Sequence, residues 1–282
     1  MKIFFNDRIV SIEDARISVL DHGFLYGDGI FESIRFYNGT AFKFDEHLRR
    51  LRKGADLIHL NIPLNDDQLK GNAYETVRAN NLSDATVRIT VTRGEGPLTL
   101  DIDQCLKPTC LIFAFAFKPY PESYFTDGIN IITADTRRNL KTAINPQVKS
   151  ANFLNNILAK YEAKRLGAQE ALMLNYLGCI TECTVSNIFF VTNGVLNTPD
   201  VSCGILDGIT RRFIIELASG AGIPVNEGQF TLRDVYNCDE VFLTNTTMEV
   251  MPVAKIDNIR FKVGEITLLL RKRFIDEVKR LV

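Results

Sequence analysis

The chain has 282 residues, of which 46% are hydrophobic and 24% charged, and its formal net charge is -1. This ordinary balance gives no general attraction for nucleic acid or a membrane surface, and no apolar run reaches bilayer-spanning length. The first fourteen residues carry charged side chains such as Asp7, Arg8 and Glu13 instead of the apolar core of a secretory signal. We therefore expect a cytoplasmic protein without nucleic-acid or membrane partners, large enough for two domains.

The first part of the chain mixes predicted strands and helices. Asn38-Gly39 lies between two apolar strands and is a strong hairpin turn, and Asp45 is expected to be the N-cap of the helix that follows. Strands are expected over 2–10 (a hairpin), 30–37, 41–44, 85–92 and 109–117, and helices over 45–58 and 66–79. Together these elements predict a small α+β domain over residues 1–118.

Two prolines, Pro119 and Pro121, favour an interdomain linker over 119–126, because proline fits poorly inside a sheet or a helix. Residues 127–282 are then the larger domain. Its expected strands are 129–134, 171–175, 187–192, 241–244 and 250–256, with helices over 209–221 and from 265. Strands are too numerous for simple alternation with helices, which disfavours a doubly wound parallel sheet.

Lys149 is the first candidate for chemistry. It lies between a loop that contains Pro146 and a predicted helix with apolar residues at helical spacing, namely Leu154, Ile157, Leu158 and Tyr161. A lysine near a helix start is ordinarily a surface charge. An amine fixed at the mouth of an element can instead lose part of its hydration and act as a nucleophile in Schiff-base chemistry.

Three further places are suited to binding a phosphate, although neither a G-x-G-x-x-G nor a P-loop motif is present. One is the glycine turn before Ile209 and Thr210, because the N–H groups at a helix N-terminus attract anions. The second is the hydroxyl-rich loop with Thr246 and Thr247. The third is Arg50, which could grip a phosphate through a bidentate fork. Each place by itself could equally be a helix cap, an ordinary loop or a solvated face.

Glu182 lies in an apolar strand sequence, where a carboxylate is costly unless it meets a cationic partner. A protonated pyridine nitrogen would be such a partner, and an ordinary strand-edge glutamate is the alternative. The six cysteines, including Cys179 and Cys183 on either side of Glu182, and the three histidines lack metal-ligand spacing. We therefore expect no metal site and reduced thiols.

Six motifs occur together in one order along the chain. They closely resemble those of the fold-type IV enzymes that use pyridoxal 5′-phosphate, a family that includes branched-chain and D-amino-acid aminotransferases and aminodeoxychorismate lyase. The resemblance extends from about residue 2 to residue 260. The motifs are Tyr26-Gly-Asp-Gly-Ile-Phe-Glu-Ser-Ile-Arg, Glu46-His-Leu-Arg-Arg-Leu, Val148-Lys-Ser-Ala-Asn, Glu182 with Ser186-Asn-Ile-Phe, Gly208-Ile-Thr, and Thr244-Asn-Thr-Thr-Met-Glu-Val-Met-Pro-Val.

The resemblance implies a homodimer whose subunit has a small N-terminal α/β domain and a larger cofactor-binding domain with a β-barrel-like core. It implies that Lys149 forms the internal aldimine and then moves the proton between the substrate Cα and the cofactor C4′. Glu182 would keep the pyridine nitrogen protonated. Further cofactor-binding residues would be Arg50, Ser186, Asn187, Ile209, Thr210 and Thr246, and the substrate-binding residues would be Phe31, Arg35, Arg93, Thr246, Thr247 and Met248.

Within the family, the motifs are most similar to those of archaeal-type branched-chain aminotransferases. Against this, Ser33 replaces a glycine, Phe153 replaces a common tyrosine, and Asn245 and Met248 replace the small residues of the branched-chain T-G-T-A-A-E turn. The resemblance implies transfer of the amino group from an L-amino acid, with branched chains preferred, to 2-oxoglutarate. The alternatives are an aminodeoxychorismate lyase that releases pyruvate and a D-amino-acid or (R)-amine aminotransferase.

Overall fold

The computed structural model describes residues 1–281, and the chain divides into two compact units. The first unit contains Met1–Lys118, Val148–Phe153 and Leu281, and the second contains Pro119–Gln147 and Leu154–Arg280. The predicted domain boundaries remain a prediction, but they assigned Lys149 to the later part of the chain. In the structure its segment returns to the first unit, because its backbone hydrogen-bonds to a strand there.

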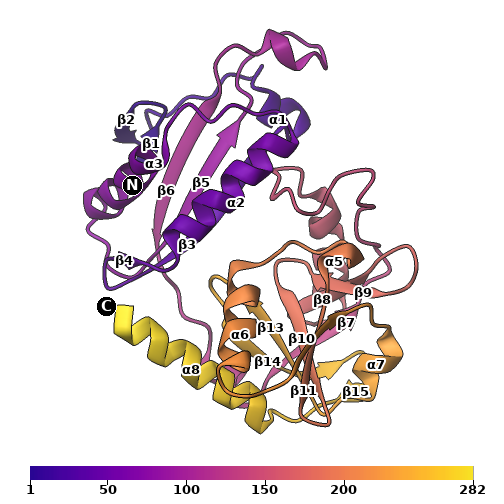
Figure 1. The fold of residues 1–282 in the computed structure, drawn as a ribbon. Coiled ribbons are helices and arrows are strands. Elements are labelled where there is room, and N and C mark those ends of the chain that lie inside the picture. Colours follow the sequence, from indigo (N-terminus) through magenta and orange to yellow (C-terminus); the bar gives the residue numbers. More distant parts are fainter. Residues whose placement is uncertain (282) are drawn as a thin grey trace. The chain divides into compact units, whose positions relative to one another are not determined.

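The first unit is built on a six-stranded antiparallel sheet in the order β2-β1-β6-β5-β3-β4 (Figure 1). Alternate residues of β3 and β5 pack against α2 and α3 in one apolar core, which includes Ile34, Ile89, Leu51 and Ala73. The strands are β1 (Lys2–Phe5), β2 (Arg8–Ser11), β3 (Gly29–Tyr37), β4 (Thr40–Ala41), β5 (Ala85–Thr92) and β6 (Thr109–Ala116), and the helices are α1 (His22–Tyr26), α2 (Phe44–Leu57), α3 (Asp66–Ala79) and the 3₁₀ turn η1 (Ile102–Gln104).

Most of the expected elements of this unit are confirmed, but the start of α2 is not. The helix begins at Phe44, its N-cap is Lys43 in the left-handed region at φ 50°, and Asp45 lies within the first turn. The strand expected over 41–44 ends at Ala41 for the same reason. Asp45 still suits this position, because a carboxylate in the first turn is favoured by the helix dipole.

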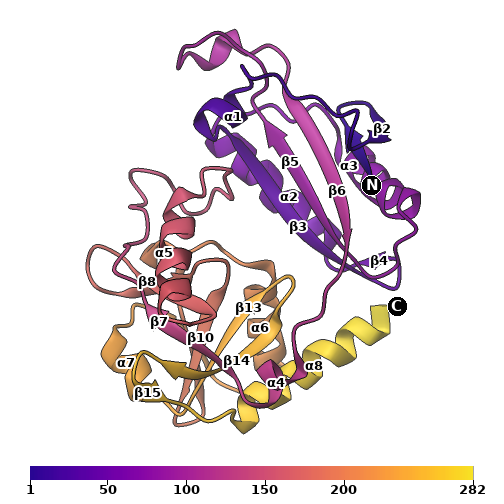
Figure 2. The same ribbon diagram turned by 180° about the vertical axis from the view of Figure 1, so that it is seen from behind.

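The second unit contains a closed ring of six strands in the order β10-β13-β14-β7-β8-β9 (Figure 2). The ring closes where Glu182 of β9 pairs with Asn187 of β10. The expected fold class, α+β with a β-barrel-like core in the larger part, is thereby confirmed. The ring strands are β7 (Ile129–Thr133), β8 (Glu170–Leu174), β9 (Ile180–Cys183), β10 (Asn187–Thr192), β13 (Glu240–Asn245) and β14 (Glu249–Ile256), with β11 (Val195–Pro199), β12 (Val225–Gly228) and β15 (Ile259–Arg260) outside the ring.

Helices surround this ring, and one of them differs from expectation in the face that it buries. Helix α5 forms where it was predicted, but Leu154, Ile157, Leu158 and Tyr161 are exposed. Ala159 and Ala163 are buried instead, because small side chains let the helix pack closely on β8. The helices are α4 (Glu122–Thr126), α5 (Leu154–Arg165), the 3₁₀ turn η2 (Val201–Cys203), α6 (Ile209–Ser219), α7 (Leu232–Tyr236) and α8 (Glu265–Leu281).

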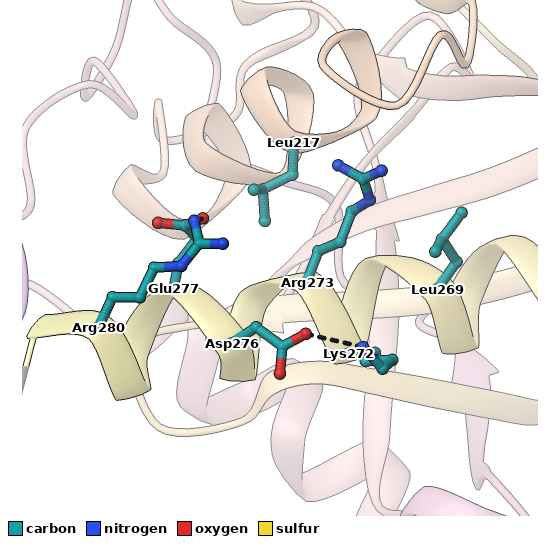
Figure 3. A pocket seen from close by; sticks show the side chains of 7 residues that line it. All are labelled: Leu217, Leu269, Lys272, Arg273, Asp276, Glu277 and Arg280. Carbon is teal, nitrogen blue, oxygen red and sulfur yellow. Dashed lines mark hydrogen bonds and ion pairs between the residues drawn. The ribbon is translucent and has the colours of Figure 1, made fainter.

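A shallow pocket lies between α6 and α8, lined by Leu217 of α6 and by residues of α8 (Figure 3). Its charged side chains are largely paired within α8, as in the exposed ion pair between Lys272 and Asp276 at 2.9 Å. None of the predicted site residues lines it. Within residues 1–281, no helix combines the length and the apolar character needed to cross a membrane.

Candidate active site

Lys149 is fixed by its own backbone. Its carbonyl accepts a hydrogen bond from the Phe31 N–H at 2.9 Å, the Ala151 N–H donates to Gly29 at 2.8 Å, and Ser150 forms a bridge with Ile30. The half-buried side chain places Nζ 4.5 Å from the centre of the Phe31 ring. An ammonium group over an aromatic face is held by the ring's negative electrostatic potential. The amine is thus positioned by a sheet rather than by a flexible loop.

A buried polar cluster lies on the opposite face of β3, where Glu32 contacts two residues of α2. Glu32 Oε1 is 2.6 Å from Arg50 Nε, and its Oε2 is 2.8 Å from Arg50 Nη2 and 2.7 Å from His47 Nδ1. Burial raises the pKa of the Glu32 carboxyl, but Arg50 and His47 outweigh it and hold that pKa well below its usual range. Burial lowers the pKa of His47 despite the opposing effect of Glu32. A neutral His47 therefore donates its Nδ1–H to the carboxylate.

This cluster changes the way in which Arg50 could hold a phosphate. Arg50 is expected to grip a phosphate through a bidentate fork, and in the structure its Nε and Nη2 groups already donate to Glu32. Arg49, the next residue on the helix, is exposed.

Two other arginines, Arg35 and Arg93, were candidates for binding the substrate, and each forms an ion pair with an aspartate of the same unit. Arg35 contacts Asp84 at 2.9 Å and stacks against the Phe117 ring at 3.7 Å. Arg93 donates from Nη2 to Asp28 at 3.0 Å and makes further bonds to the carbonyls of residues 58 and 59. Both guanidinium groups are thus already paired, and a substrate could use them only by displacing these partners.

Glu182 has the cationic partner that its burial demands, and that partner is Arg138. The Glu182 Oε1 atom is 2.8 Å from Arg138 Nη2, and both side chains are less than a tenth exposed. Its Oε2 accepts from Asn187 Nδ2 at 3.1 Å and from the Leu206 N–H at 3.0 Å. Sequence reasoning missed Arg138, because an arginine in the polar stretch before the Lys149 loop carries no local signal of burial.

Two buried polar atoms without a hydrogen-bond partner belong to residues near Glu182. In the ladder, Thr244 of β13 lies opposite Asn187, which in turn lies opposite Glu182. Among residues 1–281, Thr244 Oγ1 and Arg138 Nε are buried and lack a hydrogen-bond partner. Buried polar atoms are nearly always paired in native proteins, so these two atoms are candidates for contact with a ligand that has polar groups. A substituted pyridine with a ring nitrogen and a phenolic oxygen fits this requirement.

The N-terminus of α6 follows directly on this ladder. Gly208 is its N-cap, and Ile209 and Thr210 form the first turn and are buried. A Cβ on Gly208 would lie 2.0 Å from Asn187 Oδ1, so glycine is required for the helix to start so close to the sheet. Helix starts of this kind present N–H groups to anions. Ser186, the remaining cofactor candidate, is buried beside Asn187.

The Thr246–Thr247 turn joins β13 to β14, and the side chain of Asn245 accepts hydrogen bonds from the donor groups of this turn. Asn245 Oδ1 accepts from the Thr247 N–H at 2.8 Å, from the Met248 N–H at 2.7 Å and from Thr247 Oγ1 at 3.2 Å. Met248, a candidate for substrate contact, is 7% exposed and belongs to the apolar core of the second unit.

Comparison with known proteins gives relatives over nearly the whole chain. The model of the family described as amino-transferase class IV matches residues 29–256. A Methanocaldococcus jannaschii protein named "Putative branched-chain-amino-acid aminotransferase" is 47% identical, with 98% of this chain and 96% of that protein covered. A D-alanine aminotransferase of Listeria monocytogenes is 38% identical, with 99% and 97% covered.

The fold is shared with solved structures of the same kind. The branched-chain aminotransferase of the thermophilic archaeon Thermoproteus uzoniensis, solved with norvaline, superposes with a TM-score of 0.93 at 33% identity. The match covers 99% of this chain and 94% of that one. Two further structures of branched-chain amino acid aminotransferases, each 30% identical to this chain, contain pyridoxamine 5′-phosphate and N-(5′-phosphopyridoxyl)-L-glutamate.

Proposed function

Because the chain belongs to the class IV aminotransferases, which are pyridoxal-phosphate-dependent transferases, we propose that it transfers the amino group of an L-amino acid to 2-oxoglutarate. Branched-chain donors are preferred in this proposal, which the 47% identity to the archaeal relative supports. The observation that carries it is the position of Lys149, whose amine lies over Phe31 on a backbone that is hydrogen-bonded into the sheet.

Pyridoxal 5′-phosphate, when bound, supplies an aldehyde that condenses with amines and a protonated ring that draws electrons from the substrate Cα. Lys149 Nζ would be the amine that holds the cofactor through its aldehyde, and it would be the base that takes the proton at the substrate Cα. Glu182 holds a proton at the ring nitrogen. Arg138 assists by favouring the ionised carboxylate, since a nearby cation stabilises the charged form.

Four residues bind the phosphate in this proposal. Ile209 and Thr210 contribute the N–H groups at the start of α6, Thr246 contributes its hydroxyl, and Arg50 contributes the charge. Ser186 and Asn187 support the ring, Asn187 through its bond to Glu182. Phe31 lines the side of the substrate that faces Lys149. We also propose that the enzyme is a cytoplasmic homodimer.

A D-amino-acid aminotransferase is the second candidate, because D-alanine aminotransferases are among the relatives at 38% identity. Two observations favour the L-specific proposal. Arg93, which could capture a carboxylate in the loop region, is tied to Asp28. The side chains that follow it in that loop, Leu98 and Leu100, are apolar and exposed, so they offer a carboxylate no partner.

The test is a set of half-reactions. The purified protein is mixed separately with L-leucine, D-alanine and an (R)-amine, and the cofactor absorbance is followed as the pyridoxamine form appears. L-leucine should react fastest, and Lys149→Ala should remain folded but react with none of the donors. A faster reaction with D-alanine would refute L-specificity. Pyruvate release from aminodeoxychorismate without any conversion would identify a lyase instead.

A further inference from the structure

The Thr246–Thr247 turn, whose residues are candidates for substrate binding, already holds a carboxamide. Asn245 is the last residue of β13, and its Oδ1 accepts from two backbone N–H groups and one hydroxyl of the following turn, all within 3.2 Å. Its Nδ2 donates to the carbonyl of Val185 at 3.2 Å. The orientation of the amide is fixed by this chemistry, because the reverse orientation would point the NH₂ group at three donors.

Three donors that converge on one oxygen would also suit a carboxylate oxygen, which is a hydrogen-bond acceptor. A carboxylate that approached the N–H groups of Thr247 and Met248 would find Asn245 Oδ1 in its place. The amide is neutral and does not repel the anion, but it must rotate away before the anion can bind. Binding therefore exchanges existing hydrogen bonds for charge-assisted ones, and only the difference contributes to affinity.

We infer that Asn245 is a specificity-determining residue, a built-in competitor for the carboxylate of the substrate. This inference rests on the proposed function, which directs the carboxylate to the Thr246–Thr247 turn. It implies that donors with a carboxylate bind more weakly here than to the same turn without the amide, whereas amines without a carboxylate bind unchanged. The site thus discriminates less between amino acids and simple apolar amines.

A purely structural role for Asn245 is the competing explanation, and the chain offers a matched control. Asn175 Oδ1 accepts from the N–H groups of Leu177 and Cys179, both at 3.0 Å, in the turn between β8 and β9. Asn175→Ala removes the same kind of bonds from a turn that holds none of the proposed site residues. Asn245 has a negative φ, unlike Glu249 at φ 58°, so alanine and aspartate both fit its backbone.

The experiment measures the dissociation constant of the holoenzyme for 4-methylpentanoate, which has the carbon skeleton and carboxylate of leucine but no amine. Asn245→Ala frees the donors and should tighten binding about tenfold, equivalent to about 1.4 kcal/mol. Asn245→Asp keeps the bonds, adds a charge that repels the ligand, and should weaken binding at least about tenfold. Asn175→Ala should change it less than twofold.

Two further measurements distinguish a specificity-determining role of Asn245 from a purely structural one. The half-reaction rate with 3-methylbutylamine, which lacks a carboxylate, should be the same within about twofold for all variants. Hydrogen exchange of the Thr247 and Met248 amides in the unliganded protein should accelerate in Asn245→Ala and stay slow in Asn245→Asp.

The inference is overturned if the alanine and aspartate variants shift the dissociation constant in the same direction, if neither shifts it more than twofold, or if none of the proteins binds the ligand. Failure of the proposed function looks different. In that case the wild type converts D-alanine and not L-leucine, while the opposite shifts of the two variants persist. If Asn245→Ala binds 4-methylpentanoate and the wild type and the other variants do not, the inference is supported.

Discussion

Replacing Arg138 by methionine should destabilise the second unit strongly. The change keeps the apolar stem but removes the cation 2.8 Å from Glu182 Oε1, and the two side chains are only 9% and 7% exposed. The contacts to Asn187 and Leu206 remain on the other carboxylate oxygen. Removing one partner of a buried ion pair costs about 3–5 kcal/mol, because the other charge stays in a poorly solvated place. At roughly 2–4 °C per kcal/mol, the midpoint should fall by about 6–20 °C.

The assay is calorimetric unfolding of the apoprotein, in which the transitions of the two units can be followed in one scan. Lys272→Met is the matched control, because its pair with Asp276 has the same kind of contact at 2.9 Å but is 75% and 42% exposed. It should change stability by at most about 0.5–1 kcal/mol. Adding Glu182→Gln to Arg138→Met should recover part of the loss, because both charges are then gone. If Arg138→Met and Lys272→Met unfold at the same midpoint temperature, the ion pair between Arg138 and Glu182 does not stabilise the second unit.

Three other predictions concern Glu182, His47 and a pair of glycines. Glu182→Gln should lower kcat by orders of magnitude at saturating pyridoxal phosphate while the absorbance shows cofactor still bound, and an unchanged kcat would refute its role at the ring nitrogen. Burial lowers the pKa of His47, so below about pH 6.5 the unfolded chain binds a proton at this residue and the folded protein does not. The free energy of unfolding therefore falls as the pH drops below that value, by at most about 1.4 kcal/mol per pH unit. His47→Asn should therefore reduce the drop in thermal midpoint between pH 7.5 and 5.5, and an equal drop would exclude His47 as the titrating group. Gly94→Ala should destabilise far more than Gly39→Ala in urea unfolding, since both have φ above 80° but only at Gly94 does a Cβ meet a backbone oxygen, that of Lys107, at 1.9 Å; equal losses would show that the left-handed φ alone sets the cost.

Local signals in the sequence were sufficient to predict most helices and strands. They failed where contacts with residues far away in the sequence determine the local structure. The Asn38-Gly39 hairpin and the start of α6 at Ile209 appear as expected, because turn chemistry and helix capping depend on neighbours along the chain. Asp45 was wrong as an N-cap because Lys43 adopts the left-handed conformation, for which lysine has no preference. The apolar residues of α5 predicted a buried face, but the tight packing of Ala159 on the sheet reversed it.

The same distinction holds for the candidate site. Lys149 and Glu182 could be selected from motifs, whereas Arg138 and Glu32 could not, because their importance lies in contacts between segments far apart in sequence. Asn245 is intermediate. Asparagine before a polar turn commonly accepts from the backbone two residues on, so its capping of the turn could have been foreseen from propensity. That it occupies the two N–H groups which we propose for the substrate carboxylate could be seen only with the turn in three dimensions.

The hydrogen bonds between β3 and the Lys149 segment also set a constraint on the nascent chain. When Lys118 leaves the ribosome, the first unit has all of its sheet strands but not the segment that covers the Gly29–Phe31 edge. At roughly 5–20 residues per second, translation to Phe153 takes about another 2–7 s. During that interval the Phe31 N–H and the Gly29 carbonyl form an open strand edge, which is a template for pairing with other chains. The segment that closes this edge also carries Lys149, the proposed nucleophile, so a chain that stops before it lacks both this amine and the protection of the edge.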